Sequence, residues 1–167
     1  MLPPPVPLLS GSCVSADMVQ YATCPSPFGS ILIGWEGDAV VSLHLGEVNS
    51  NLTSPVSKLA AAQLQEYFAG TRKIFTFPIE LRGTPFQISV WEALSKIPYG
   101  QVVTYKDIAK AIGNEKAVRA VGMACNRNPI WITIPCHRVV GTNRKLTGYA
   151  GGLSMKEVLL NHESQYR

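Results

Sequence analysis

The pattern of the sequence changes near residue 82, and this change constrains the fold more than any other feature. Before it, short apolar runs alternate with turn residues, which is typical of strands in an antiparallel meander. After it, Ser and Thr caps precede apolar residues at helical spacing. We therefore predict an α+β chain, with a small antiparallel-sheet lobe over residues 18–81 and a mostly helical C-terminal domain over residues 82–167.

Within the first lobe, the runs at residues 18–22, 30–35 and 39–45 are the expected strands. A capped helix is expected over residues 54–70, because Ser and Pro open it, an apolar stripe follows and Gly closes it. Residues 74–81 are either a last strand or an extended linker. The proline within them favours an edge position, since proline cannot donate to a ladder.

The composition of the chain indicates the cellular compartment in which the protein works. Residues 1–17 contain four prolines and are predicted to be a flexible tail. The four cysteines show no close pairing, which favours a reducing compartment. No apolar run approaches the roughly 20 residues that span a bilayer, so no membrane partner is expected. We expect a monomer in the cytoplasm, or in the nucleus if the source is eukaryotic.

The charge is divided unevenly between the two parts. The chain has a net charge of +4, yet residues 1–81 carry three basic and six acidic side chains, against twelve basic and five acidic from residue 82 onward. A basic domain of this kind favours a polyanionic partner, with nucleic acid the leading candidate. A solvated basic face without a partner is the alternative.

Three helices are expected at the start of the basic domain, over residues 84–97, 104–114 and 115–126. Caps at Thr84 and Thr104 open the first two, and a Gly-Asn pair separates the second helix from the third. A helix, a short glycine-containing turn and a second helix form the helix-turn-helix pattern, which other helical hairpins share.

The third helix has an unusual outer face. Its inward positions are Val118, Val121 and Cys125, and its outward positions carry one long cation, Arg119. A slim helix of this kind suits the minor groove and carries little sequence information. The residues predicted to contact DNA, with Tyr105 from the preceding helix, are Arg119, Ala120, Gly122 and Met123. Arg119 is a candidate to replace a base extruded from the duplex, and the alternative is an ordinary surface arginine.

A cysteine follows an apolar run in the second half of this domain. Residues 130–134 are β-branched and aromatic and are predicted to form a buried strand, which Pro135 ends. Cys136 therefore sits where a site can open. A nearby cation lowers the pKa of a thiol, and His137 and Arg138 are candidate sources of that field. The alternative is an inert core cysteine.

Several motifs in order resemble those of the O6-alkylguanine-DNA alkyltransferases, also called methylated-DNA-protein cysteine methyltransferases. The motifs are Arg119–Gly122, Asn128-Pro129, Pro135–Val139 and Gly148–Gly152. The resemblance covers residues 84–163 closely and the first lobe loosely. It implies a protein that flips O6-alkylguanine out of duplex DNA and transfers the alkyl group irreversibly to its own cysteine, once per molecule and without a cofactor.

The resemblance also implies roles for individual residues. Cys136 is the nucleophile, and His137 is the base that acts on it through a water. Glu163 holds the imidazole, Asn128 braces the network, and Tyr105 donates to the leaving guanine. From the residues alone, Tyr105 is more often a core position. Glu163 lies on the apolar side of a helix that a Ser154–Glu157 capping box is predicted to open, so its carboxylate needs a partner unless the helix end frays.

The resemblance implies a guanine pocket formed by the backbone of Val139 together with Tyr149, Ala150, Trp131 and Cys125. Trp131 is bulkier than the proline that some relatives carry there, so a free benzylguanine base is expected to react more slowly than methylated DNA. Cys125 is either a second reactive thiol or a small buried side chain. The range of alkyl groups and O4-alkylthymine as a second substrate stay open.

The sequence leaves two alternative functions open. A recognition module that binds alkylated DNA without transfer is one, although the presence of Cys136 argues against it. A metal site built from Cys125, Cys136 and His137 is the other, and it lacks the closely spaced ligand pairs of structural zinc sites. We therefore expect no metal.

Overall fold

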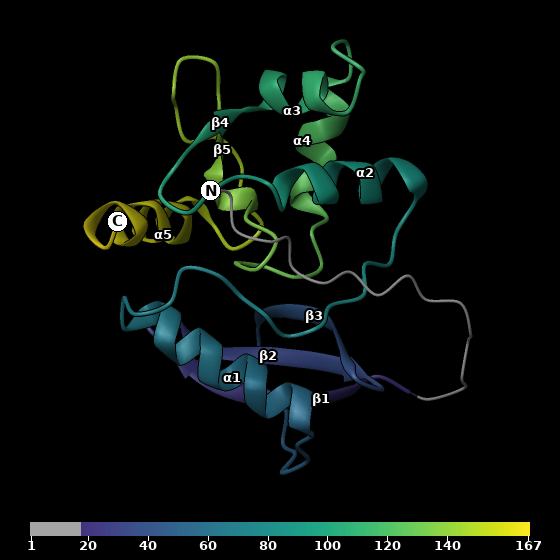
Figure 1. Ribbon diagram of the computed structural model, residues 1–167, viewed down its shortest axis with the longest axis vertical. Helices are drawn as coiled ribbons and strands as arrows, with labels where there is room; N and C mark the ends of the chain where they lie inside the picture. The colour runs from purple at the N-terminus through teal and green to yellow at the C-terminus, as the bar shows by residue number, and fades with distance from the viewer. Residues whose placement is uncertain (1–17) are drawn as a thin grey trace. The chain divides into compact units, whose positions relative to one another are not determined.

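The computed structural model describes residues 18–167, which divide between Arg82 and Gly83 into two compact units. The first unit holds a three-stranded sheet and one long helix, and the second holds the other helices with a two-stranded ladder (Figure 1). The α+β prediction is confirmed. The tail predicted for residues 1–17 lies outside the described part of the chain.

The sheet of the first unit is the predicted antiparallel meander. Its strands are β1 (Gln20–Ser26), β2 (Gly29–Glu36) and β3 (Ala39–Leu45), in that order across the sheet. Strand β1 starts later than predicted and continues to Ser26, which pairs with Gly29. Because only two residues connect the paired ends, the turn is tight, and Gly29 adopts a φ of 107° that disfavours other residues.

Helix α1 (Pro55–Phe68) contacts all three strands. Ser54 and Ser57 form a reciprocal capping box at its start, and the buried stripe includes Ala60, Leu64 and Tyr67. Burying a side chain of the size of Leu stabilises the fold by about 1.5–3 kcal/mol, so this stripe fixes the helix on the sheet. The helix prediction is confirmed.

Residues 74–81 form an extended segment rather than a strand. One isolated bridge joins Ile79 to Val40, and the backbone nitrogen of Val40 donates to the Pro78 oxygen at 2.9 Å. Phe75 and Phe77 are buried. Of the two alternatives left open by the sequence, the extended linker is correct.

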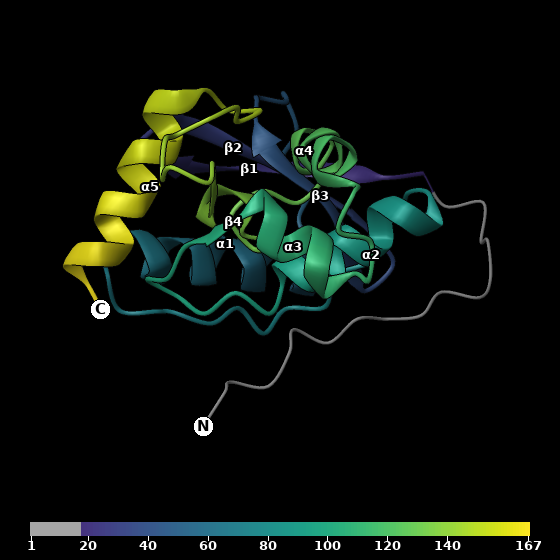
Figure 2. The same ribbon diagram turned by 90° about the horizontal axis from the view of Figure 1, so that it is seen from above.

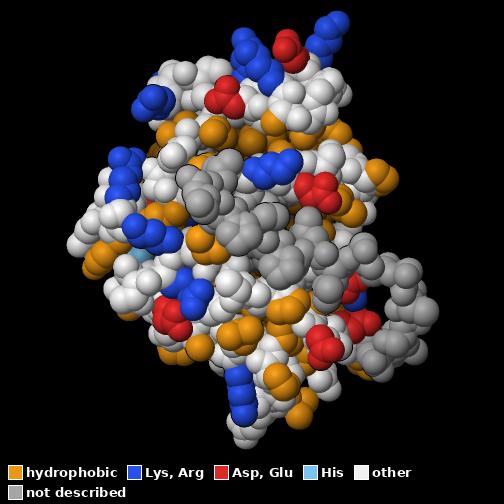
Figure 3. Space-filling model, viewed as in Figure 1, with side chains coloured by type: hydrophobic (Ala, Val, Ile, Leu, Met, Phe, Trp, Pro, Cys, Tyr) orange, Lys and Arg blue, Asp and Glu red, His pale blue; other side chains and the backbone are white. Residues whose placement is uncertain are grey.

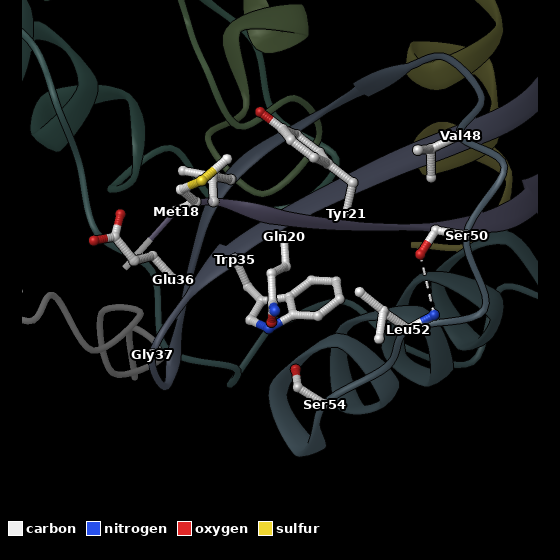
Figure 4. Close-up of a pocket in the computed structure, with 11 residues that line it drawn as sticks. Met18, Gln20, Tyr21, Trp35, Glu36, Gly37, Val48, Ser50, Leu52 and Ser54 are labelled. Atoms are coloured by element: carbon white, nitrogen blue, oxygen red, sulfur yellow. Dashed lines mark hydrogen bonds between the residues drawn. The ribbon is translucent and has the colours of Figure 1, made fainter. Parts of the chain in front are cut away.

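The first unit also carries an open hollow beside β1 and β2. Figure 4 shows Tyr21, Trp35 and Leu52 around it, with Glu36 at one side. The backbone of Leu52 is held by a hydrogen bond to the Ser50 hydroxyl at 3.1 Å. All of the lining residues belong to the first unit, and they bring together no pair of titratable side chains suited to acid-base chemistry.

The second unit begins with three capped helices. They are α2 (Pro85–Leu94), α3 (Tyr105–Ala111) and α4 (Val118–Asn126). Capping boxes at Thr84 and Thr104 match the sequence prediction. Helix α4 starts at Val118, three residues later than predicted, because residues 115–116 form a turn, and no side chain caps it. Helices α3 and α4 contact each other.

A short parallel ladder joins two distant parts of this unit. Strand β4 (Val103–Thr104) pairs with β5 (Val139–Val140), so the residue that begins α3 lies close to the segment that contains Cys136. Figures 1 and 2 show helix α5 (Leu153–Gln165) on one side of this ladder and α2, α3 and α4 on the other. None of the helices in residues 18–167 is long and apolar enough to cross a membrane.

The start of α5 differs from the sequence prediction. The helix begins at Leu153, and its N-cap is Gly152, which makes no side-chain cap bond. The predicted capping box between Ser154 and Glu157 is therefore wrong. Gly152 has a φ of 95°, so a glycine there lets the chain turn sharply into the helix.

Candidate active site

Cys136 opens a single turn of 3-10 helix, η1 (Cys136–Arg138), directly after Pro135. Its side chain is 4% exposed, and the thiol is free. The side-chain amide of Asn128 donates to Sγ at 3.2 Å. Because the chain turns here instead of running extended, the two neighbours Cys136 and His137 are not forced onto opposite sides of a strand.

The predicted strand at residues 130–134 is wrong, since these residues form a buried turn. The reason is Asn128. Its Oδ1 accepts from the Ile130 backbone nitrogen at 3.0 Å, and its Nδ2 donates to the Ile134 oxygen at 2.8 Å. Trp131 Nε1 donates to the Asn128 oxygen at 3.1 Å. A buried backbone needs such partners outside a ladder, and one asparagine side chain supplies two of them.

A charged network lies directly behind the thiol. His137 Nε2 is 2.5 Å from Glu163 Oε2, and Arg138 Nε donates to Glu163 Oε1 at 2.7 Å. Arg138 also donates to the Ile97 oxygen at 2.7 Å, and Gly100 donates its backbone nitrogen to Glu163 at 3.2 Å. Glu163 is 1% exposed, so the helix end does not fray into solvent.

The protonation of this network follows from its surroundings. Burial alone would raise the pKa of Glu163, but its hydrogen bonds and charge interactions with His137 and Arg138 outweigh burial and hold that pKa below its usual range. Burial lowers the pKa of His137, against the pull of Glu163. A neutral His137 that donates from Nε2 to the carboxylate keeps Nδ1 unprotonated, and Nδ1 has no hydrogen-bond partner among the described residues.

Cys136 is a thiol rather than a thiolate at neutral pH. Burial raises its pKa to about 11, although the Asn128 hydrogen bond and the charge of Lys156 act in the opposite direction. The sequence suggested that positive charge on His137 and Arg138 lowers the pKa of Cys136, and the structure does not support this. Arg138 is instead directed to Glu163 and to a backbone oxygen.

The cation near the thiol is Lys156, which the sequence reasoning missed. Its side chain is fully buried in α5, and Nζ donates to the Val139 oxygen at 2.5 Å and to the Thr147 oxygen at 2.9 Å. Burial lowers its pKa. The signal was present in the sequence, because Lys156 lies seven residues before Glu163 and therefore on the same helical face.

Tyr105, the first residue of α3, lies where the elements of the site meet. Its hydroxyl donates to the Thr147 oxygen at 3.0 Å, and Lys156 Nζ lies 5.8 Å from the centre of its ring. A Cβ atom added to Gly122 of α4 would come within 3.9 Å of the ring. The ring is half-buried, so Tyr105 is at once a packing residue and the link between α4 and the segment around Thr147.

An aromatic pair lies at the predicted pocket. The rings of Trp131 and Tyr149 are 5.9 Å apart between centroids, and burial raises the pKa of Tyr149. A Cβ atom added to Gly151 would meet Met155 Sδ at 2.6 Å and Trp131 at 3.1 Å, so only glycine fits there without displacement. Ala150, between the tyrosine and this glycine, is exposed.

Two further predicted pocket residues are buried. The Val139 backbone oxygen was expected to face guanine, but in the structure it accepts a hydrogen bond from Lys156. Cys125 is 6% exposed, and burial followed by the proximity of Cys136 raises its pKa to about 12. A thiol with so high a pKa is a poor nucleophile at neutral pH, which favours the small-core-residue alternative.

The outer face of α4 is exposed, as the periodicity predicted. Arg119, Ala120, Met123 and Asn126 face solvent and Gly122 is half-buried, whereas Ala124 is buried and does not belong to this surface. Figure 3 shows Lys and Arg side chains, with Asp and Glu side chains among them, over the upper part of one face, where α3 and α4 lie in the same view. Residues 104–127 carry five basic and two acidic side chains, so the helix is slim and lies within a region of net positive charge.

Two family models cover this chain. Residues 85–165 match the DNA-binding domain of 6-O-methylguanine DNA methyltransferase, and residues 19–81 match its ribonuclease-like domain. A protein of Bacillus subtilis named methylated-DNA–protein-cysteine methyltransferase, constitutive, is 47% identical over 87% of this chain and 96% of its own length. One of the same name without that qualifier, from Methanosarcina acetivorans, is 48% identical over 87% and 98%.

Solved structures agree with the sequence matches. The crystal structure of Mycobacterium tuberculosis OGT in complex with DNA is 43% identical, with a TM-score of 0.81 over 87% of this chain and 93% of that one. The M. tuberculosis O6-methylguanine methyltransferase structure is 40% identical, with a TM-score of 0.79 over 90% and 95%. The chain belongs to the 6-O-methylguanine DNA methyltransferase family.

Proposed function

We propose that this protein repairs DNA by transferring the alkyl group of O6-alkylguanine to its own Cys136. The observation that carries the proposal is a buried thiol held by Asn128 next to a histidine whose other nitrogen is fixed by Glu163. The relatives are named methylated-DNA–protein-cysteine methyltransferases, which supports transfer from DNA to a cysteine of the protein. The basic region around α4 supports DNA as the partner.

The transfer is a single displacement at the alkyl carbon. The Cys136 sulfur forms a bond to that carbon while the carbon–O6 bond breaks, and the electron pair of the broken bond stays with guanine. The thiol proton leaves through the unprotonated Nδ1 of His137, by way of a water, and guanine gains a proton in turn. His137 must act because the pKa of Cys136, about 11, leaves little thiolate at neutral pH.

The remaining residues position the reacting groups. Glu163 and Arg138 hold the imidazole in the tautomer that accepts a proton, and Asn128 fixes the sulfur. Tyr105 donates to the guanine ring as it leaves, which requires its hydroxyl to exchange the Thr147 oxygen for the base. Trp131 and Tyr149 wall the pocket.

The DNA is bound through the minor groove, with little sequence preference. The small side chains of Ala120 and Gly122 let α4 approach the backbone closely, and Arg119 fills the place of the flipped base. The M. tuberculosis structure is a complex of OGT with DNA, which supports DNA binding by this relative of it. We propose that the protein acts as a monomer in the cytoplasm.

Each molecule acts once, because the thioether formed on Cys136 is a poor leaving group and lies outside reversible thiol chemistry. The test is the amount of O6-methylguanine lost from a duplex present in tenfold excess over protein. We expect the loss to stop at one equivalent and to vanish in Cys136→Ser. Continued turnover, or tight binding of the damaged duplex without loss of the methyl group, would contradict the proposal.

A further inference from the structure

A tight basic loop follows β5 and takes no part in the site as described so far. The backbone of residues 141–145 closes on itself, with Gly141 nitrogen donating to the Lys145 oxygen at 3.0 Å and Arg144 nitrogen donating to the Gly141 oxygen at 2.8 Å. The Asn143 side chain accepts from the Lys145 nitrogen at 3.1 Å. These bonds give the loop a defined shape.

Arg144 is held in an unfavourable backbone conformation at the tip of this loop. Its φ is 60°, and within residues 18–167 only Ile132 shares a positive φ without being glycine. The left-handed region costs a residue with a side chain on the order of 1 kcal/mol. Strain of this kind, kept at an exposed position where glycine would relieve it, points to a use for the side chain.

Both ends of the loop are fixed beside Tyr105. Strand β5 pairs with β4, which leads directly into Tyr105, and the Thr147 oxygen accepts from the Tyr105 hydroxyl and from Lys156. The ring of Tyr105 in turn adjoins Gly122 on the outer face of α4. Tyr105 therefore lies between the end of the loop and the proposed DNA-binding helix.

The two cations of the loop are not used inside the protein. Arg144 and Lys145 are exposed, and neither forms an ion pair with any residue of the described chain. Exposed cations on a fixed loop attract phosphate through charge alone, without reading the bases.

We propose that Arg144 and Lys145 form a phosphate clamp that binds the DNA backbone next to the flipped nucleotide and so orients the duplex on α4. The proposal rests on the proposed function, since it names a second part of the same DNA-binding surface. The clamp acts on duplex DNA only and contributes nothing to a free base that has no phosphate.

The test compares the wild type with the double variant Arg144→Gly and Lys145→Gln. Glycine suits the positive φ of Arg144, so the loop keeps its shape while both charges are lost. We expect affinity for undamaged duplex to fall, and the slope of log affinity against log salt to become shallower by about 1.8, since each phosphate contact contributes about 0.9. The rate with free O6-methylguanine should not change.

Two controls separate charge from structure. Arg144→Lys keeps the charge and should keep the salt slope, and Lys58→Gln removes an exposed charge from α1 in the first unit and should change nothing. An unchanged slope in the double variant would overturn the clamp. Equal losses on duplex and free base would also overturn it, because the loop would then shape the pocket. Failure of the wild type to transfer the methyl group from either substrate would instead refute the proposed function.

Discussion

Cys136 and Arg119 belong to the same unit, but their surroundings are opposite. Cys136 is buried among charged side chains that are ion-paired or hydrogen-bonded within the protein, whereas Arg119 projects into solvent from a slim helix. Paired and buried charges fix geometry, and a free exposed charge is available to a partner. The buried network should therefore control the chemistry on every substrate, and the exposed face should matter only when the substrate is a duplex.

The largest expected effect comes from Glu163→Gln. The change leaves the buried Arg138 guanidinium without its carboxylate and replaces one of the two accepting oxygens by an NH2 group, so His137 and Arg138 no longer both keep their acceptor. The free energy of unfolding should therefore fall by about 3–5 kcal/mol. Transfer should slow by roughly 100-fold on duplex and free base alike. Urea denaturation and single-turnover rates measure the two effects. Glu157→Gln, exposed on the same helix, is the matched control, and a loss confined to duplex DNA would contradict the comparison.

The second largest effect is expected for Arg119→Ala, which tests the role of the exposed face of α4. Flipping a base costs a few kcal/mol, so losing the residue that replaces it should slow repair of duplex DNA by about 10- to 100-fold. The rate with free O6-methylguanine should stay that of the wild type, and so should the free energy of unfolding. Equal losses on both substrates would show that Arg119 does not act in flipping.

Trp131→Ala should have a smaller effect that depends on the alkyl group. The wild type should react more slowly with free O6-benzylguanine than with methylated DNA. Removal of the indole should speed the benzyl reaction by about tenfold, the lower end of what one steric contact contributes. Trp131→Phe, which keeps an aromatic wall but loses the bond to the Asn128 oxygen, separates bulk from hydrogen bonding. Equal wild-type rates for the two substrates would refute the steric role.

The smallest expected effects appear in the pH profile. Burial lowers the pKa of His137, so the folded state prefers the neutral ring, and stability should be complete above about pH 6.5 and fall as the pH drops below it. The transfer rate should hold to lower pH than the stability does, because the rate depends on the lowered pKa of the folded protein. Between pH 7 and 9 the rate with free base should be flat, because the proton passes from Cys136 to His137 inside the protein. A tenfold rise per pH unit would mean that free thiolate reacts without the histidine.

Much of the fold was predictable because it is encoded locally. Caps at Ser54, Thr84 and Thr104 set helix starts that the structure confirms, and strand periodicity identified the meander. The turn at residues 130–134 was missed, since its β-branched composition favours a strand and only the side chain of Asn128 holds it in another shape. The strand propensity of these residues does not depend on the Asn128 side chain, so it could not predict the turn.

Sequence motifs predicted which residues form the site, but they did not predict the properties that depend on burial, such as the pKa of Cys136. The motifs and the family resemblance pointed to Cys136, His137 and Glu163. The structure places Cys136 and His137 in one 3-10 turn and joins His137 to Glu163. The direction of the Cys136 pKa shift was not foreseen, because the sequence shows neighbouring cations but not how they are used. Arg138 is bound to Glu163. The charge that lowers the pKa of the thiol comes instead from Lys156, which belongs to helix α5.

The most direct test of the account is the mass of the intact protein, followed by peptide mapping, after incubation with excess duplex that carries one O6-methylguanine. We expect one added methyl group per molecule, all of it on Cys136, with Cys24 and Cys125 unmodified and no further gain on longer incubation. Methylation of another cysteine, or an unchanged mass after the duplex has bound, would contradict the claim that Cys136 is the acceptor.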